Sequence, residues 1–109
     1  METEGNVKGK TPAIVAYFTI FGSIIAIFLN LEEKHEFARY HTRQALALHL
    51  FLLLSLALIS GFENVMIYSA FYLAYIVLWV YGFIGAIAGK KHEIPFLGPF
   101  AQKFFSKII

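Results

Sequence analysis

Three long stretches of the sequence contain no Asp, Glu, Lys or Arg: residues 13–29, 45–62 and 64–89. An α-helix rises about 1.5 Å per residue, so about 17–25 apolar residues are enough to cross the hydrocarbon core of a bilayer. All three stretches reach that length. Hydrophobic residues make up 59% of the chain and charged residues 15%, which is far from the balance of soluble domains. The sequence therefore predicts an all-α, polytopic membrane protein.

We expect one membrane domain over residues 1–109, with three transmembrane helices at about 12–29, 45–61 and 65–89. Polar residues 31–44 predict a surface-lying extension of the second helix. Residues 99–109 place phenylalanines and isoleucines on one helical face and lysines on the other, which predicts an amphipathic interfacial helix at the C-terminus. A cleavable signal peptide is not expected, because the first apolar run is too long for one and lacks a small-x-small site.

Lysine and arginine positions predict the orientation. With three spans, the first loop and the C-terminal segment share a side that carries seven of these residues, against two in the N-terminal tail. The positive-inside rule then places the C-terminus in the cytoplasm and the N-terminus outside, in a bacterial inner membrane. Four basic side chains are predicted to contact lipid phosphates at the interface: Arg39, Arg43, Lys103 and Lys107.

Small and aromatic residues recur at helical spacing on the first and third predicted spans. Small residues let helix backbones approach closely in lipid. The stripes favour either packing within the chain or a subunit interface, and we expect a homo-oligomer or a larger membrane complex. The helix-packing candidates are Gly22, Ala26, Tyr72, Tyr75, Trp79, Gly82, Gly85 and Gly89.

Two polar side chains share one face where the second predicted span enters the membrane: His41 and Gln44. His49 lies deeper in that span, and an ionisable residue at such a position is a functional candidate. His41 and Gln44 either belong to an interfacial anchor or form a site for a ligand, a partner's carboxylate or a transported segment. His49 either bonds a facing Ser, Thr or Tyr side chain or headgroup water, or transfers protons. The spacing of His35, His41 and His49 does not bring all three to one face, and there is no cysteine, so no metal site and no cofactor is expected.

Motifs of common enzyme classes are absent. The sequence has no HExxH, GxSxG, Walker A or GxGxxG pattern, and its acidic residues are not paired inside the predicted spans. Its basic clusters are small and adjoin the membrane, so nucleic-acid binding is not expected. We interpret the chain as non-enzymatic, with the lipid bilayer as its first partner.

Several of these residues also resemble a known family. The pattern runs from Phe37 through His41 and Gln44 to Pro95 and Gly98. In this arrangement the chain is similar to bacterial relatives of the twenty-kilodalton subunit of the chloroplast inner-envelope protein import translocon, the Tic complex. The resemblance covers roughly residues 12–105. It implies a multi-helix inner-membrane protein with a role in protein transport, and it implies that these five residues are the family positions.

Three functional hypotheses follow. The first is a translocon-like or channel-like component, as the resemblance implies. The second is an accessory or scaffold subunit of a larger membrane complex. The third is a carrier of small solutes or protons that uses His49.

Overall fold

The computed structural model describes residues 8–61 and 64–107. In these residues the chain forms five α-helices and one short 3-10 helix, and no β-strand, which confirms the all-α prediction. The elements are α1 (Lys10–Ala16), α2 (Ile20–Leu29), α3 (Glu36–Ile59), α4 (Val65–Ala88), α5 (Leu97–Phe104) and the 3-10 helix η2 (Phe105–Lys107).

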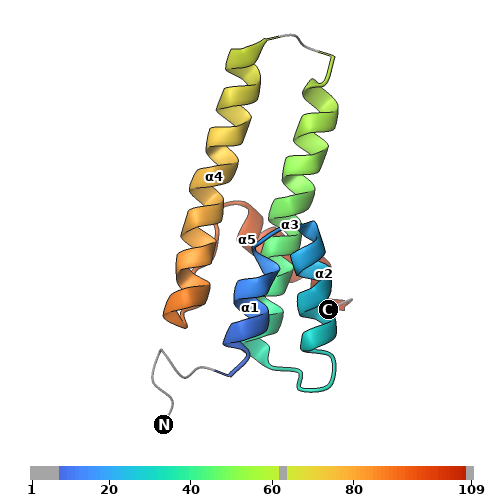
Figure 1. The fold of residues 1–109 in the computed structure, drawn as a ribbon, viewed down its shortest axis with the longest axis vertical. Helices are drawn as coiled ribbons and strands as arrows, with labels where there is room; N and C mark the ends of the chain where they lie inside the picture. The colour runs from blue at the N-terminus through green and yellow to red at the C-terminus, as the bar shows by residue number, and fades with distance from the viewer. Residues whose placement is uncertain (1–7, 62–63, 108–109) are drawn as a thin grey trace.

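Helices α3 and α4 form a long antiparallel hairpin (Figure 1). Among the described residues, these are the two helices long and apolar enough to cross a bilayer. Asn64 caps the second of them, because its Oδ1 accepts the backbone N–H of Met66 at 2.9 Å. We call the end with the α3–α4 turn the tip, and the opposite end, where α3 begins and α4 ends, the base.

The first predicted span is not a single helix. The helix is interrupted at residues 17–19, between α1 and α2. Thr19 is fully extended (φ −156°, ψ 180°), and its Oγ1 accepts the N–H of Gly22 at 3.2 Å as the N-cap of α2. The cap turns the chain back, so α1 and α2 pack against each other as a pair. The prediction of a continuous helix over 12–29 is therefore wrong.

Both ends of the α1–α2 pair lie at the base. Gly9 contacts the side chains of His35 and Ala38. At the other end, the side-chain amide of Asn30 accepts the N–H of His35 at 2.9 Å and donates to its carbonyl at 3.1 Å. The chain enters and leaves beside the start of α3, so the pair does not cross the length of the hairpin. This removes the three-span premise that placed the N-terminus opposite the C-terminus.

The predicted surface-lying extension of the second helix, residues 31–44, is helical from Glu36 on and continuous with the span, but it is buried against other elements. Residues 31–35 are not helical, and α3 runs unbroken from Glu36. The first three turns of α3 bury most of their side chains, Phe37, His41 and Gln44 among them. Their partners are the α1–α2 pair and the segment after α4, neither of which the periodicity of one helix reveals.

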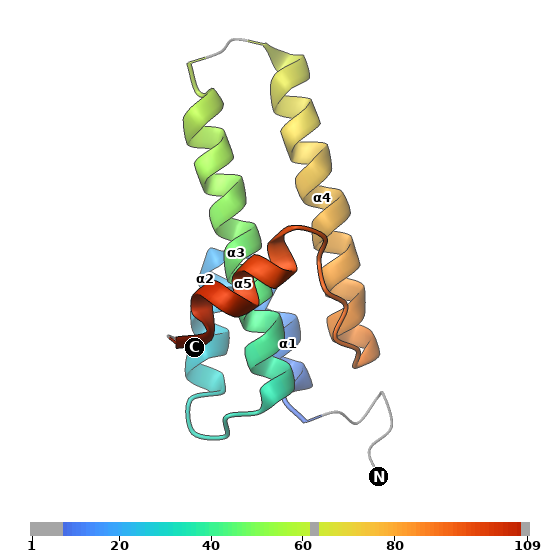
Figure 2. The same ribbon diagram turned by 180° about the vertical axis from the view of Figure 1, so that it is seen from behind.

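The C-terminal helix begins at Leu97 and crosses α3 in the base half of the hairpin (Figure 2). Ala101 and Phe105 pack against Ala47 of α3. The opposite face is apolar and open, with Phe96 93% exposed and Phe100 and Phe104 also exposed. The predicted amphipathic helix is present over 97–104, and the last two residues of its predicted range, 108–109, lie outside the described part of the chain.

Candidate functional site: a buried polar network at the base

The imidazole of His41 joins three elements. Its Nε2 lies 2.8 Å from the carbonyl oxygen of Lys90, and its Nδ1 lies 2.6 Å from the hydroxyl of Tyr17. A carbonyl can only accept, so Nε2 donates to it, and in the neutral imidazole Nδ1 then accepts from the Tyr17 hydroxyl. His41 therefore links α3 to the α1–α2 break and to the chain after α4.

Gln44 uses both ends of its amide. Its Nε2 donates to the Tyr17 hydroxyl at 3.0 Å and to the carbonyl of His92 at 2.8 Å. Its Oε1 accepts the backbone N–H of Ile94 at 2.8 Å. The Gln44 side chain therefore bonds the backbone of residues 92–94 through both its amide N–H and its carbonyl oxygen. Together with His41, it holds the segment after α4 against α3.

His49 makes the same kind of contact deeper in α3. Its Nε2 donates to the carbonyl of Ala16 at 3.0 Å, and its Nδ1 lies 3.3 Å from the hydroxyl of Tyr75. The Ala16 carbonyl also accepts from the hydroxyl of Ser23 at 2.8 Å. The indole N–H of Trp79 donates to the next carbonyl, that of Tyr17. Both carbonyls stand at the end of α1, where a helix leaves such groups without a partner.

Tyr17 is fully buried at the centre of this arrangement. Burial raises the pKa of its hydroxyl well above the ordinary value, and the hydrogen bond from Gln44 acts in the opposite direction. The Tyr17 hydroxyl therefore stays protonated and donates a hydrogen bond to His41. Edge-on ring contacts with His41 and Phe83 complete its surroundings.

The side chains of the network hydrogen-bond backbone groups at two breaks in the helices. An unpaired backbone N–H or C=O costs several kcal/mol where water is absent, so non-helical chain at membrane depth needs partners from other elements. His41 and Gln44 supply them for residues 90–94, and His49, Ser23 and Trp79 supply them for the break after α1. The arrangement rigidifies two breaks in the fold, and no polar atom named here is left to face a substrate.

The glycines of the predicted stripes lie at close approaches inside the chain. A Cβ at Gly82 would lie 2.8 Å from the ring of Tyr17, and one at Gly85 would lie 2.7 Å from His92. Gly22 approaches the backbone carbonyl of Val15, where α1 meets α2. Gly89 has φ +76° and ends α4, with the N–H of Lys90 bonded back to the Gly85 carbonyl at 2.8 Å.

The remaining stripe residues divide between the base and the tip. Ala26 is fully buried, Trp79 bonds the α1–α2 break, and Tyr75 contacts His49 of α3. Tyr72 is exposed on the tip half of α4. These contacts are those of packing within one chain, apart from Tyr72, whose role as an interface residue stays a prediction.

The four predicted lipid-phosphate contacts differ in exposure. Arg39 is partly exposed and Lys103 is exposed on α5. Arg43 is buried instead, and its Nη1 donates to Oε1 of Gln102 at 3.2 Å, because α5 covers this face of α3. The side chain of Lys107 lies outside the described part of the structure.

The motif residues meet around Gln44. Phe37 packs its ring against that of His41, with centroids 4.7 Å apart. Gly98 lies so close that a Cβ there would be 2.8 Å from the Gln44 Oε1. Pro95 is exposed in the turn before α5. Sequence reasoning found His41, Gln44 and His49 but did not include Tyr17 among the candidates. The signal it missed was Thr19 followed by Gly22, an N-cap pattern inside an apolar run.

Tyr17→Phe tests the network with almost no change in volume. We expect it to lower the free energy of unfolding by about 2 kcal/mol, because His41 Nδ1 and a Gln44 N–H both lose a buried partner. The measurement is thermal or denaturant unfolding in detergent micelles. Tyr72→Phe, at an exposed position, is the control and should change stability little. Equal stability of the two variants would contradict the assigned role.

The sequence also matches a known protein family over most of its length. The sequence model of the magnetosome magnetite crystal formation protein family (MamF/MmsF) matches residues 8–102. The chain belongs to this family. The match includes both long helices, the α1–α2 pair and every residue of the polar network.

This family assignment corrects the resemblance to the Tic import subunit, which is wrong. The residues that suggested it, from Phe37 to Gly98, all fall within the region that the MamF/MmsF model matches. In this structure the polar pair at the start of α3 bonds the backbone of the chain break after α4, which is a structural role. Such a role does not identify a translocon.

A curated relative supports the membrane assignment. The chain is 28% identical over 85 residues to the UPF0132 membrane protein MJ1527 of Methanocaldococcus jannaschii, which covers 76% of this chain. The matched part spans 61% of that relative's length. No solved structure matches the chain. The protein is thus a small membrane protein with transmembrane helices.

Proposed function

We propose that this chain is a non-enzymatic protein that shapes or organises the membrane, by inserting more protein into one leaflet than into the other. One observation carries the proposal. Helices α1, α2 and α5 all pack on the base half of the α3–α4 hairpin, whereas the tip half consists of the two long helices alone (Figures 1 and 2). The described part of the chain is therefore thick at one end and thin at the other.

The side chains support placing the thick end in lipid. The outward face of α2 exposes phenylalanine and isoleucine side chains, with Phe21 71% exposed and Phe18 and Phe28 also exposed. The α1–α2 break reaches His49, thirteen residues after Glu36, or about 20 Å along α3 at 1.5 Å per residue. Large apolar side chains at that depth are stable against acyl chains and costly in water. We therefore assign the α1–α2 pair to one leaflet, as a re-entrant element.

Charge supports one orientation. All nine Lys and Arg residues lie outside residues 44–89, so in a two-span hairpin all of them belong to the base side. The positive-inside rule then places the base, with both termini, in the cytoplasm. This replaces the expectation of an N-terminus outside. A protein that widens the cytoplasmic leaflet favours membrane that is convex toward the cytoplasm.

The polar network gives no support to the other functional classes. His49, the carrier candidate, is hydrogen-bonded through both ring nitrogens. Within residues 8–61 and 64–107, no three His, Asp or Glu side chains are grouped so that they could hold a metal ion. The family description concerns magnetite crystal formation, and for this chain we propose that any such role acts through the membrane. The expected homo-oligomer or larger complex stays a prediction.

Single-vesicle measurements test the proposal. The full chain, labelled and reconstituted into vesicles of mixed size, should show a protein density that rises as vesicle diameter falls. In the smallest vesicles the base should face outward, as judged by protease access to the Lys-containing base segments. Both expectations follow because the outer leaflet of a small vesicle has more room for the thick end.

A matched pair of variants isolates the α1–α2 pair. Phe21→Lys places a charge beside the break at depth, which costs about 2.5–3.5 kcal/mol at a helix centre and should draw α2 toward the interface. We expect Phe21→Lys to lose most of the preference of the wild type for small vesicles. Leu31→Lys makes the same kind of change in the non-helical loop between α2 and α3, at the base, and should keep it. A wild-type density that does not depend on diameter, or equal loss in both variants, would refute the proposal.

A further inference from the structure

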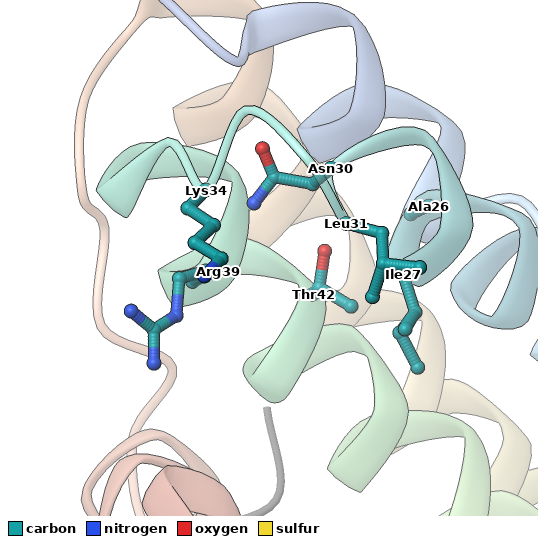
Figure 3. A pocket seen from close by; sticks show the side chains of 7 residues that line it. All are labelled: Ala26, Ile27, Asn30, Leu31, Lys34, Arg39 and Thr42. Carbon is teal, nitrogen blue, oxygen red and sulfur yellow. The ribbon is translucent and has the colours of Figure 1, made fainter.

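A pocket of about 250 Å³ lies at the base between α2 and the start of α3, apart from the polar network. Figure 3 shows three kinds of side chain around it. Lys34 and Arg39 lie at one side, Asn30 and Thr42 in the middle, and apolar side chains at the other. The apolar group consists of Ala26, Ile27 and Leu31. Since one water occupies roughly 30 Å³ of liquid, the pocket has room for several waters or a small anionic group.

Thr42 is the residue that points to a ligand. It is 2% exposed, and its hydroxyl has no hydrogen-bond partner in the structure. In Figure 3 this hydroxyl points toward the loop that carries Asn30 and Leu31, across the pocket. Asn30 does not satisfy it, because both ends of the Asn30 amide are bonded to the backbone of His35. A buried hydroxyl without a partner is rare in proteins and calls for an occupant.

Of the described residues that line the pocket, two are cations, Lys34 and Arg39, and none is an acid. Three acids lie nearby without lining it. Glu33 is bonded to a histidine ring, Glu36 lies 3.8 Å from Arg39, and Glu32 is exposed. The side chains that line the pocket therefore suit an anion.

We propose that this pocket binds a phosphate group, with the Thr42 hydroxyl donating a hydrogen bond and Lys34 and Arg39 supplying the charge. Two sources can provide it: the headgroup of an anionic phospholipid, or a free phosphate in solution. The apolar wall of Ile27 and Leu31 favours the lipid, because it continues toward the lipid-facing side of α2 and would contact the glycerol and upper acyl carbons. The phosphate site itself is independent of the membrane-shaping proposal, whereas the choice of a lipid as its source rests on the assignment of α2 to a leaflet made there.

Binding to the purified full chain in a zwitterionic detergent tests the site. The probes are a short-chain phosphatidylglycerol and inorganic phosphate, each titrated with thermal unfolding and native mass spectrometry as readouts. We expect phosphatidylglycerol to bind at least tenfold more tightly than inorganic phosphate. If the two bind equally and respond alike to the variants below, the phosphate site stands and a soluble phosphate is its source.

Thr42→Val gives the sharpest prediction. It removes the hydroxyl at nearly constant shape, so phosphatidylglycerol affinity should fall about tenfold, as for a hydrogen bond to a charged group. Without lipid the variant should unfold at the same temperature as the wild type or higher, because an unsatisfied buried group is gone. If Thr42 had a purely structural role, Thr42→Val would not lower phosphatidylglycerol affinity while leaving the unfolding temperature unchanged or higher.

Charge variants complete the test. Lys34→Gln and Arg39→Gln should each weaken phosphatidylglycerol binding severalfold. Lys91→Gln, the control, makes the same change at the same end of the molecule, where Lys91 lies over the ring of Tyr40 and outside the pocket. It should bind as the wild type does. Wild-type affinity in Thr42→Val, or an equal loss in Lys91→Gln, would overturn the proposal in favour of diffuse attraction to the base.

Discussion

Replacing Gln44 with leucine is expected to lower the free energy of unfolding by about 4 kcal/mol and to release the chain after α4. The change leaves the carbonyl of His92 and the N–H of Ile94 without partners in a buried place, at about 1–3 kcal/mol for each group. It also removes one hydrogen bond from Tyr17. Unfolding in detergent measures the first effect. Amide hydrogen exchange at Ile94 measures the second and should accelerate strongly.

The control for this prediction is Gln102→Leu. Gln102 also bonds a backbone carbonyl of α3, that of Tyr40 at 2.8 Å, but it is partly exposed. The substitution also removes the acceptor of the buried Arg43 Nη1, so we expect a loss of up to about 3 kcal/mol but little change in hydrogen exchange at Ile94. If Ile94 stayed protected in Gln44→Leu, the amide of Gln44 would not be what holds this segment.

Adding a single methyl group at Gly22 is expected to have the second large effect. The Cβ of Gly22→Ala would be driven into the backbone carbonyl of Val15, where α1 and α2 meet. A carbonyl in a helix cannot move aside as the end of a flexible side chain can, so the two helices must separate. We expect a loss of about 3 kcal/mol, at the upper end of the range for overpacked sites. Unfolding in detergent is again the measurement.

Gly61→Ala is the matched control for Gly22→Ala. It adds the same methyl group at a position where nothing lies within 4 Å. The stability of Gly61→Ala should stay within about 0.5 kcal/mol of the wild type, as for most surface substitutions. A Gly22→Ala protein as stable as Gly61→Ala would mean that α1 and α2 do not meet as described.

The two long helices could be predicted from the sequence because their signal is local. Residues 45–61 and 65–89 are apolar throughout, and a short turn joins them, so length and hydropathy alone indicate an antiparallel hairpin. The observed α4, Val65–Ala88, agrees with its predicted span to within one residue. The observed α3 begins at Glu36, within the extension predicted for residues 31–44, and the polar side chains of residues 36–44 are covered by other elements instead of lying at the membrane surface.

The α1–α2 break shows where hydropathy stops being informative. Residues 13–29 are as apolar as a spanning helix, and the end of α1 can separate from α2 only because Ser23, His49 and Trp79 bond its free carbonyls. Two of these side chains are more than thirty residues away in the sequence. The candidate site could be predicted only in part. His41, Gln44 and His49 stand out as polar residues in an apolar helix, but their partners are set by packing.

The sequence by itself determined that this protein is helical, that it enters a bilayer, and that its cations gather outside the long apolar helices, since composition and charge order are local properties. Only the tertiary structure decided which apolar stretches form helices long enough to cross a bilayer, and which groups the buried polar side chains bond. The physical reason is that a backbone group in lipid must find a partner. Whether the partner is the next turn of the same helix or a histidine on another one depends on the packing of the whole chain.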